Sequence, residues 1–256
     1  MLKLSSLKID PEFSAQILPL SFEELQQLEQ NIIAEGRLLN PIITWNGYIL
    51  DGHTRYRILK KHGFIKFEVE EIQLANKYEA LAWICKNQLG RRNLSPERKK
   101  FLLGKEYEST KLAVGGQPGN CNKVNRCDQN DHIDSEKRTC ERIAVEHGVG
   151  SATVRRAEKY MNGVEAADEA APGAREEILN GKIKAADREI CAIAKAPKEQ
   201  RSEIVAELRK PKSERDKQLT SSTKSPSVSV KVESFDDDGS RFLIGISKKY
   251  KGTKGH

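Results

Sequence analysis

The sequence predicts an α+β fold: a small sheet with helices in the N-terminal part, then an all-helical region and a largely disordered C-terminal tail. Apolar residues recur at helical spacing over residues 21–35, which indicates an amphipathic helix. Two short β-rich runs then flank Asn46-Gly47, the dipeptide that most strongly favours a two-residue hairpin. From Ser95 to about residue 209 the expected elements are helices. The sheet is therefore expected near the N-terminus.

A first domain is expected over residues 1–95. Its leading helix begins at Ser21, which can form a capping box with Glu24, and Gly36 ends it. The later elements of this domain follow from β-rich runs, turn residues and helical spacing. They are expected in the order strand 41–45, strand 48–50, helix 53–62, strand 67–74 and helix 76–88.

The rest of the chain is expected to divide into a helical region over 96–165, a helical segment over 166–210 and a low-complexity tail over 211–256. Ser95-Pro96 opens the first helix, because Ser caps helices and Pro suits their first turn. Residues 113–134 are rich in Gly, Asn, Asp and Pro and almost free of apolar residues, which is typical of a flexible linker. Further helices are expected over 174–180, 185–195 and 197–209, and a β-hairpin over 228–246.

Composition excludes several classes of protein. The net charge of +7 over 256 residues is spread along the chain, so charge alone does not identify a nucleic-acid binder. The sequence has neither a membrane-spanning apolar run nor a secretory signal, so a cytoplasmic protein without a membrane partner is expected. The five cysteines are expected to be reduced thiols. The group Cys121, Cys127, His132 and Cys140 lacks tight Cys-x2-Cys pairs, so no zinc is expected and Cys140 is expected to pack as a small apolar residue.

Residues 139–161 have the spacing of a helix-turn-helix. Ala144 is small where a second helix would cross, and Gly148 can adopt the left-handed conformation that a tight turn needs. Val154 would pack the second helix back onto the first. Ser151 is expected to cap the second helix. The apolar side is completed by Ile143, Val149, Ala157 and Met161.

The free face of the second helix is basic, and the N-terminal part of such a helix enters the major groove of double-stranded DNA. An ordinary helical hairpin with a solvated basic face is the alternative interpretation. We favour DNA binding. The candidate DNA-contacting residues are Ser151, Thr153, Arg155, Arg156 and Lys159.

A candidate phosphate site lies in the N-terminal domain. The segment YILDGHTRYRILKKHG (48–63) has the form strand, Gly turn, helix start, and a helix N-terminus offers free N–H groups to an anion. A second arginine cluster lies in NQLGRRNLSPE (87–97). A solvated turn before a basic helix would have the same composition. The candidate phosphate-binding residues are Gly52, His53, Thr54, Arg55, Arg91 and Arg92.

Three motifs occur in one order: FEELQQLEQNIIAEGRLLNPI (22–42), DGHTRYRILKKHG (51–63) and NQLGRRNLSPE (87–97). With a helix-turn-helix after them, the chain resembles the ParB partition proteins over about residues 4–110. The resemblance implies that the last two motifs hold CTP, or another nucleoside triphosphate, with Mg²⁺. It also implies a DNA-binding protein of plasmid or phage partition or of gene regulation, located on the nucleoid or a plasmid.

By position, Gly52 and Arg55 match the Gly and the second Arg of the first ParB box. Arg91 and Leu94 match the Arg and the Leu of the second box. The resemblance further implies a homodimer. A ParA-type ATPase partner is not strongly implied, because this chain begins almost directly with the domain.

The chain also departs from the ParB pattern. His53 and Thr54 replace a Glu and an Arg, and Gln88 stands where the family has its magnesium-binding Asn, which makes Gln88 the candidate Mg²⁺ ligand. At most slow nucleotide hydrolysis is therefore expected. Relatives with Gly-His-x-Arg boxes are phosphotransferases, so the alternative is a nucleotide-dependent phosphotransferase with an appended helix-turn-helix. Asp51 or Glu35 would then act as the base.

Overall fold

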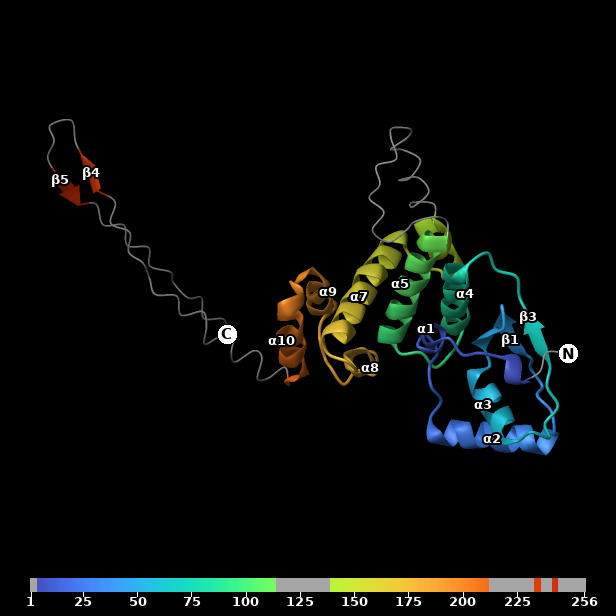
Figure 1. The fold of residues 1–256 in the computed structure, drawn as a ribbon. Helices are drawn as coiled ribbons and strands as arrows, with labels where there is room; N and C mark the ends of the chain where they lie inside the picture. Colours follow the sequence, from blue (N-terminus) through green and yellow to red (C-terminus); the bar gives the residue numbers. More distant parts are fainter. Residues whose placement is uncertain (1–3, 114–138, 212–232, 236–240, 244–256) are drawn as a thin grey trace, which may run out of the picture. The chain divides into compact units, whose positions relative to one another are not determined.

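The computed structural model describes residues 4–113, 139–211, 233–235 and 241–243. Residues 1–211 form one compact unit and residues 212–256 form a second. Figure 1 shows the elements in chain order. None of the described helices is long and apolar enough to cross a membrane.

The N-terminal part holds a three-stranded sheet with the order β2-β1-β3. Strands β1 (Ile42–Trp45) and β2 (Tyr48–Asp51) are antiparallel, and they are joined at Asn46-Gly47, where both residues have a positive φ. This confirms the expected hairpin. Strand β3 (Val69–Glu71) runs parallel to β1 and is shorter than the expected strand 67–74. Beyond β3 the chain still makes hydrogen bonds to β1. Ile72 N donates to the Thr44 carbonyl at 2.9 Å, and Trp45 Nε1 donates to the Leu74 carbonyl at 2.9 Å.

Three helices of the N-terminal part, over residues 22–35, 53–61 and 77–89, agree with the expected ones, whereas two short helices before residue 15 were not expected. Ser21 and Glu24 form the capping box of α2, and Gly36 ends that helix in the left-handed conformation. The elements are η1 (Leu4–Ser6), α1 (Pro11–Ser14), α2 (Phe22–Glu35), α3 (His53–Lys61) and α4 (Lys77–Leu89).

The sheet separates two apolar clusters. Ile49 and Leu50 are neighbours in β2 and both are fully buried, because successive side chains of a strand point to opposite faces. Ile49 belongs to a cluster with Ile32 of α2 and residues of α3. Leu50 belongs to a cluster with Phe13 of α1 and Ile84 of α4. The turn that joins β2 to α3 is therefore held by packing on both sides.

The second half of the unit is helical, as expected. Helices α4, α5 and α7 run side by side (Figure 1). Ser95 caps α5, since its Oγ accepts from Arg98 N at 3.2 Å. The helices are α5 (Pro96–Ala113), a helix over residues 139–146, α7 (Ser151–Ala170), α8 (Ala174–Leu179), α9 (Asp187–Lys195) and α10 (Lys198–Arg209).

Helix α7 is longer than the expected second helix, which was to end at residue 161. Val164 and Ala167 continue its buried face and pack against α9 and α10, so nothing interrupts the helical pattern. The expected boundary between residues 165 and 166 consequently falls inside α7. The remaining domain boundaries stay predictions.

In the second unit, β4 (Glu233–Phe235) pairs antiparallel with β5 (Arg241–Leu243). These strands lie within the hairpin expected over 228–246. The linker expected over 113–134 lies outside the described residues from residue 114 onward, as does the low-complexity stretch over 212–232.

Candidate functional site

A cavity of about 450 Å³ lies at the carboxyl end of β2, where the chain turns into α3. Its wall is built from four places: the connection between α1 and α2, the inner side of α2 with the residues after it, the start of α3, and the turn between α4 and α5. Five of the six predicted phosphate-binding residues line it, namely Gly52, His53, Thr54, Arg55 and Arg91.

The polar end of the cavity contains a carboxylate between two guanidinium groups. Asp51 Oδ2 accepts a 2.7 Å hydrogen bond from Arg55 Nη2, and Asp51 Oδ1 lies 3.8 Å from Arg91 Nη2. All three side chains are partly exposed to the cavity. Arg91 comes from the turn after α4, so the ion pairs join two segments that are distant in sequence. An anion that entered here would meet two preformed positive groups and would compete with Asp51 for them.

Gly52 places the N-terminus of α3 at the same end of the cavity. It is the N-cap residue, with φ 93°, and the first turn of α3 contains no acidic residue. The first N–H groups of a helix lack partners within the helix and carry the positive end of its dipole. The helix start and the two arginines therefore present positive charge from different directions.

His53 is the most buried polar residue of this wall. Its side chain is 5% exposed, and neither ring nitrogen has a hydrogen-bond partner among the described residues. Burial lowers the pKa of His53 to about 4, so the ring is neutral near pH 7. A neutral imidazole carries one N–H donor and one acceptor, and in His53 both are buried without a hydrogen-bond partner among the described residues.

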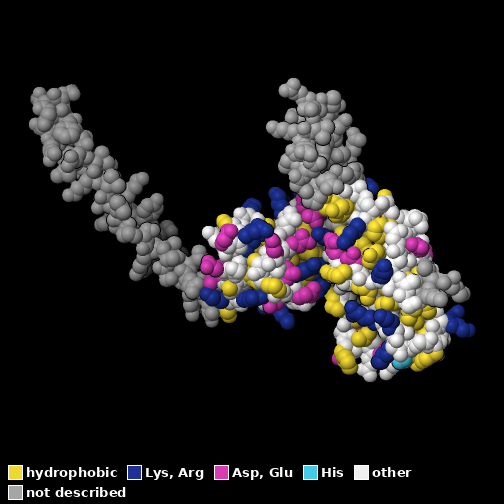
Figure 2. Space-filling model, viewed as in Figure 1, with side chains coloured by type: hydrophobic (Ala, Val, Ile, Leu, Met, Phe, Trp, Pro, Cys, Tyr) yellow, Lys and Arg dark blue, Asp and Glu magenta, His cyan; other side chains and the backbone are white. Residues whose placement is uncertain are grey.

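The other end of the cavity is apolar, with polar groups at its rim. It contains side chains that the sequence analysis did not single out, since no local motif marks them. On the face shown in Figure 2, Lys and Arg side chains lie next to hydrophobic ones between α1 and α2. The apolar wall consists of Ile17, Leu18, Leu20, Leu28, Ile32, Leu38 and Leu39, and the polar residues are Asn31, Glu35, Arg37 and Asn40.

Two predicted residues lie elsewhere. Arg92 is exposed and is not part of the cavity wall. Gln88 is also outside the wall and is 1% exposed, and its side-chain amide has no hydrogen-bond partner among the described residues. Its role as an Mg²⁺ ligand stays a prediction.

A second candidate site is the pair of helices joined at Gly148. The turn is tight, because Val149 N donates to the Ala144 carbonyl at 2.9 Å and Gly148 has φ 64°. Ala144 and Val154 are buried between the helices, as predicted. Val149 was expected on the apolar side, but it is partly exposed because the turn carries it outward.

The start of α7 differs from the expectation. Ser151 was expected to be the N-cap, but Gly150 occupies that position without a side-chain cap, and Ser151 is the first helical residue. The Gly150 carbonyl accepts from Thr153 N at 2.8 Å, so the backbone already closes the first turn. The Ser151 carbonyl accepts from the Cys140 Sγ at 3.1 Å. Cys140 is fully buried, as expected for a small apolar residue, whereas Cys121, Cys127 and His132 lie outside the described residues.

The outer face of α7 carries exposed cations. Arg155 and Arg156 are exposed, and neither makes an ion pair within the described part of the chain. Glu158, the acidic residue of this stretch, is instead bonded to Lys111 of α5. Thr153 and Lys159 are exposed beside the arginines. The beginning of α7 therefore presents positive charge that pairs with no carboxylate of the described residues.

A hydrogen bond between side chains holds the end of the helix over 139–146 against α5. His147 Nε2 lies 2.8 Å from Glu106 Oε2, and burial raises the pKa of Glu106. Glu146 lies within 4.8 Å of both, but it is already paired with Lys86 of α4. This cluster fixes the position of the turn before α7.

No family model matches the chain, and no curated protein matches it. The chain is similar to solved structures of ParB N-domains over most of its length. A Pnob8-like ParB-N domain is 16% identical, with 86% of this chain and 87% of that chain covered and a TM-score of 0.49. The C-terminally truncated chromosome-partitioning protein ParB from Caulobacter crescentus, complexed to the centromeric parS site, is 17% identical, with 87% and 91% covered and a TM-score of 0.37. The same protein complexed with CTP-gamma-S is 17% identical, with 81% and 96% covered and a TM-score of 0.29.

Proposed function

We propose that this protein is a ParB-like DNA-binding protein of plasmid or phage partition or of gene regulation, and that a nucleoside triphosphate in the cavity controls it. The observation that carries the proposal is the exposed basic face at the start of α7, directly after a tight turn. This is the arrangement of a DNA-binding helix-turn-helix, in which the second helix enters the major groove.

DNA binding is tested by the double substitution Arg155→Ala/Arg156→Ala. We expect the affinity for duplex DNA to fall at least about tenfold at fixed salt, because both guanidinium groups are free to reach base edges or phosphates. The measurement is a gel-shift titration repeated over several salt concentrations. If both arginines contact phosphates, the slope of log affinity against log salt falls by about two.

The matched control is Lys182→Ala/Arg188→Ala. Both residues are exposed, one after α8 and one in α9, and their replacement removes the same charge from another place. If this control weakened binding as much as the α7 variant, general charge rather than the α7 face would be responsible.

For the cavity, we propose CTP or another nucleoside triphosphate with Mg²⁺ as the ligand. The phosphates would bind at the start of α3 between Arg55 and Arg91, with His53 as a further hydrogen-bonding group. The apolar end would take the base. Mg²⁺ would add positive charge between the phosphate oxygens, and Asp51 in the cavity wall is a carboxylate that could turn toward it.

Nucleotide binding is tested by calorimetry with the four nucleoside triphosphates and Mg²⁺. Arg55→Ala and Arg91→Ala should each abolish binding while circular dichroism stays unchanged, and Arg→Lys should weaken it, because an ammonium cannot make bidentate contacts. Arg92→Ala is the control, since Arg92 lies next to Arg91 in sequence but outside the cavity wall. Wild-type protein that bound none of the four nucleotides would contradict this part of the proposal.

A nucleotide-dependent phosphotransferase is the competing function, and Glu35 in the cavity wall favours it. Asp51 is a poor candidate for the base because its carboxylate is engaged by two arginines. A phosphotransferase should turn over without DNA and should lose its rate on Glu35→Gln. A nucleotide-controlled DNA binder should instead change its DNA affinity with little turnover.

We further propose that the protein acts as a cytoplasmic homodimer on DNA. A two-fold axis would place two α7 helices in successive major grooves, which is the usual arrangement for helix-turn-helix dimers. Sedimentation with and without DNA measures the oligomeric state.

A further inference from the structure

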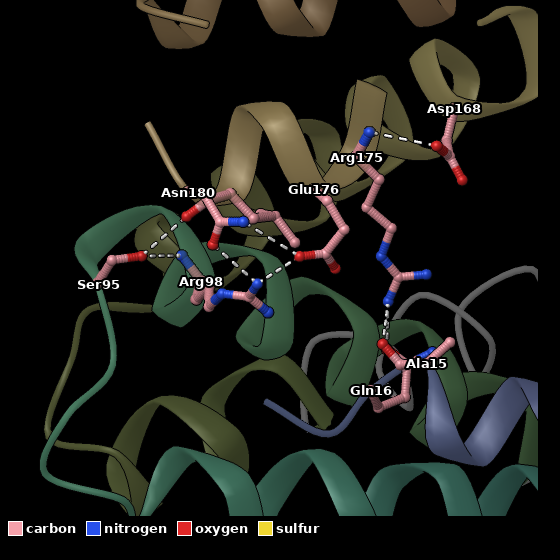
Figure 3. Close-up of polar contacts among 9 residues, drawn as sticks. Ala15, Gln16, Ser95, Arg98, Asp168, Arg175, Glu176 and Asn180 are labelled. Carbon is pink, nitrogen blue, oxygen red and sulfur yellow. Dashed lines mark hydrogen bonds and ion pairs between the residues drawn. The ribbon is translucent and has the colours of Figure 1, made fainter. Parts of the chain in front are cut away.

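The segment between α1 and α2 contacts both the cavity and the helical half of the unit. Leu18 lines the cavity and also packs against the apolar cluster of α5 and α7–α10. Just before it in the chain, the Ala15 carbonyl accepts from Arg175 Nη2 at 2.8 Å and Gln16 Oε1 accepts from the same nitrogen at 3.1 Å. Figure 3 shows Arg175 reaching across from α8 to this segment. A ligand in the cavity would therefore touch Ile17 and Leu18, which directly follow the two residues bonded to α8.

Arg175 is held rigidly at its own end. Its guanidinium carbon lies 4.4 Å from the centre of the Phe101 ring, and its backbone N–H donates to Asp168 Oδ1 at 3.2 Å. Asp168 also accepts from Gly173 N at 2.9 Å, and it belongs to α7. A stacked, planar guanidinium allows few other geometries. A shift of Ala15 and Gln16 must therefore either break their hydrogen bonds to Arg175 or move α8 against α7.

A second connection reaches α8 from the other wall of the cavity. Arg91 is followed within a few residues by Ser95, whose Oγ donates to the Leu179 carbonyl at 3.2 Å (Figure 3). Arg98 then pairs with Glu176 at 2.6 Å. Helix α8 is thus bonded to the segment between α1 and α2 and to the start of α5, at residues that lie within a few positions of the cavity wall along the chain. Through Asp168 it is also bonded to α7, the helix that presents the basic face.

We propose that Arg175 is a positioning residue that couples filling of the cavity to the DNA affinity of α7. The inference rests on the proposed function. A ligand alters an equilibrium only as far as it prefers one of two arrangements, and here the arrangements differ in how Ala15 and Gln16 lie against Arg175. Coupling is reciprocal, so DNA changes the affinity for the ligand by the same factor.

The test compares DNA affinity with and without saturating nucleotide in wild type and in Arg175→Met. The nucleotide is whichever triphosphate binds the wild type most tightly in calorimetry with Mg²⁺, and the DNA is a duplex recovered by selection. Methionine keeps an apolar stem over Phe101 and removes the bonds to Ala15 and Gln16. In the wild type we expect the DNA affinities with and without nucleotide to differ about fivefold or more. In Arg175→Met the same two affinities should differ by less than about twofold. Should Arg175→Met fail to fold, Gln16→Leu replaces it.

Arg201→Met is the matched control. Arg201 of α10 also donates to backbone carbonyls, those of Ala194 and Ala196 at 3.2 and 3.1 Å, but it contacts no residue of the cavity wall. It should lower stability and leave the affinity ratio unchanged. A wild-type ratio in Arg175→Met overturns this inference alone. A ratio of one in a wild type that binds both ligands overturns the proposed control by nucleotide, and this inference with it. A wild type that binds no triphosphate or no DNA overturns the proposed function together with it.

Discussion

At the scale of single residues, the cavity depends on groups whose charges are set by their neighbours. Asp51 faces Arg55 and Arg91, so in the free protein a carboxylate takes the place that a phosphate would take. His53 is buried beside them and is kept neutral. The positive groups of the cavity are thereby held in position before any ligand arrives.

The first prediction at this scale concerns His53. The pKa of His53 is lowered to about 4 in the folded protein from 6.5, so the unfolded chain takes up the proton at higher pH. Stability is therefore complete above pH 6.5 and is lost as the pH falls toward 4, by up to about 3 kcal/mol from this group. Urea unfolding between pH 7 and pH 4 should show a smaller loss in His53→Asn than in wild type. Equal losses in both proteins would mean that the ring is not buried as a neutral group.

At the scale of elements, α5 and α7 cross at very short distance in the helical half. A Cβ added at Gly104 would lie 2.3 Å from the Ala157 carbonyl and 2.8 Å from the Met161 Cβ. Only a residue without a side chain allows the two helices to approach so closely. This contact also brings Lys111 to Glu158, the residue between Arg156 and Lys159.

Gly104→Ala should therefore be destabilising, although Ala favours helices. We expect the free energy of unfolding to fall by about 1–3 kcal/mol, as for overpacking of a core. The measurement is chemical denaturation followed by circular dichroism. Gly63→Ala serves as the control, because nothing lies within 4 Å of a Cβ at that position. A Gly104→Ala protein as stable as this control would contradict the close crossing.

At the scale of the whole molecule, residues 1–211 form one compact unit although the sequence suggests several domains. Helix α5 packs against both α4 and α7, and Arg175 of α8 bonds to Ala15 in the sheet-containing half. The cavity and the proposed DNA-binding face of α7 lie in the same unit, so they can affect each other without a hinge between separate domains.

We expect this unit to unfold in one transition. Trp45 and Trp83 both lie in the sheet-containing half, so tryptophan fluorescence reports on that half. Far-ultraviolet circular dichroism reports mainly on the helices of the other half. The two unfolding curves should coincide, as two-state behaviour requires. Separate midpoints would show that the halves unfold independently.

Much of the fold could be predicted from the sequence because its signals are local. The capping box of Ser21 and Glu24 and the turn at Asn46-Gly47 depend on residues only a few positions apart. The same holds for the helix boundaries and for the tight turn at Gly148. The errors arose where tertiary packing decides: Val149 is partly exposed, and α7 continues to Ala170 because α9 and α10 cover its far end.

The sequence by itself determined the α+β class, most element boundaries and the residue types of both candidate sites. Only the tertiary structure decided that Arg91 meets Asp51, that Gln88 and Arg92 stay outside the cavity, and that Arg175 reaches Ala15. The physical reason is the distance along the chain over which each interaction acts. Capping and turn formation act over a few residues, whereas a cavity and its electrostatics depend on which distant segments pack together.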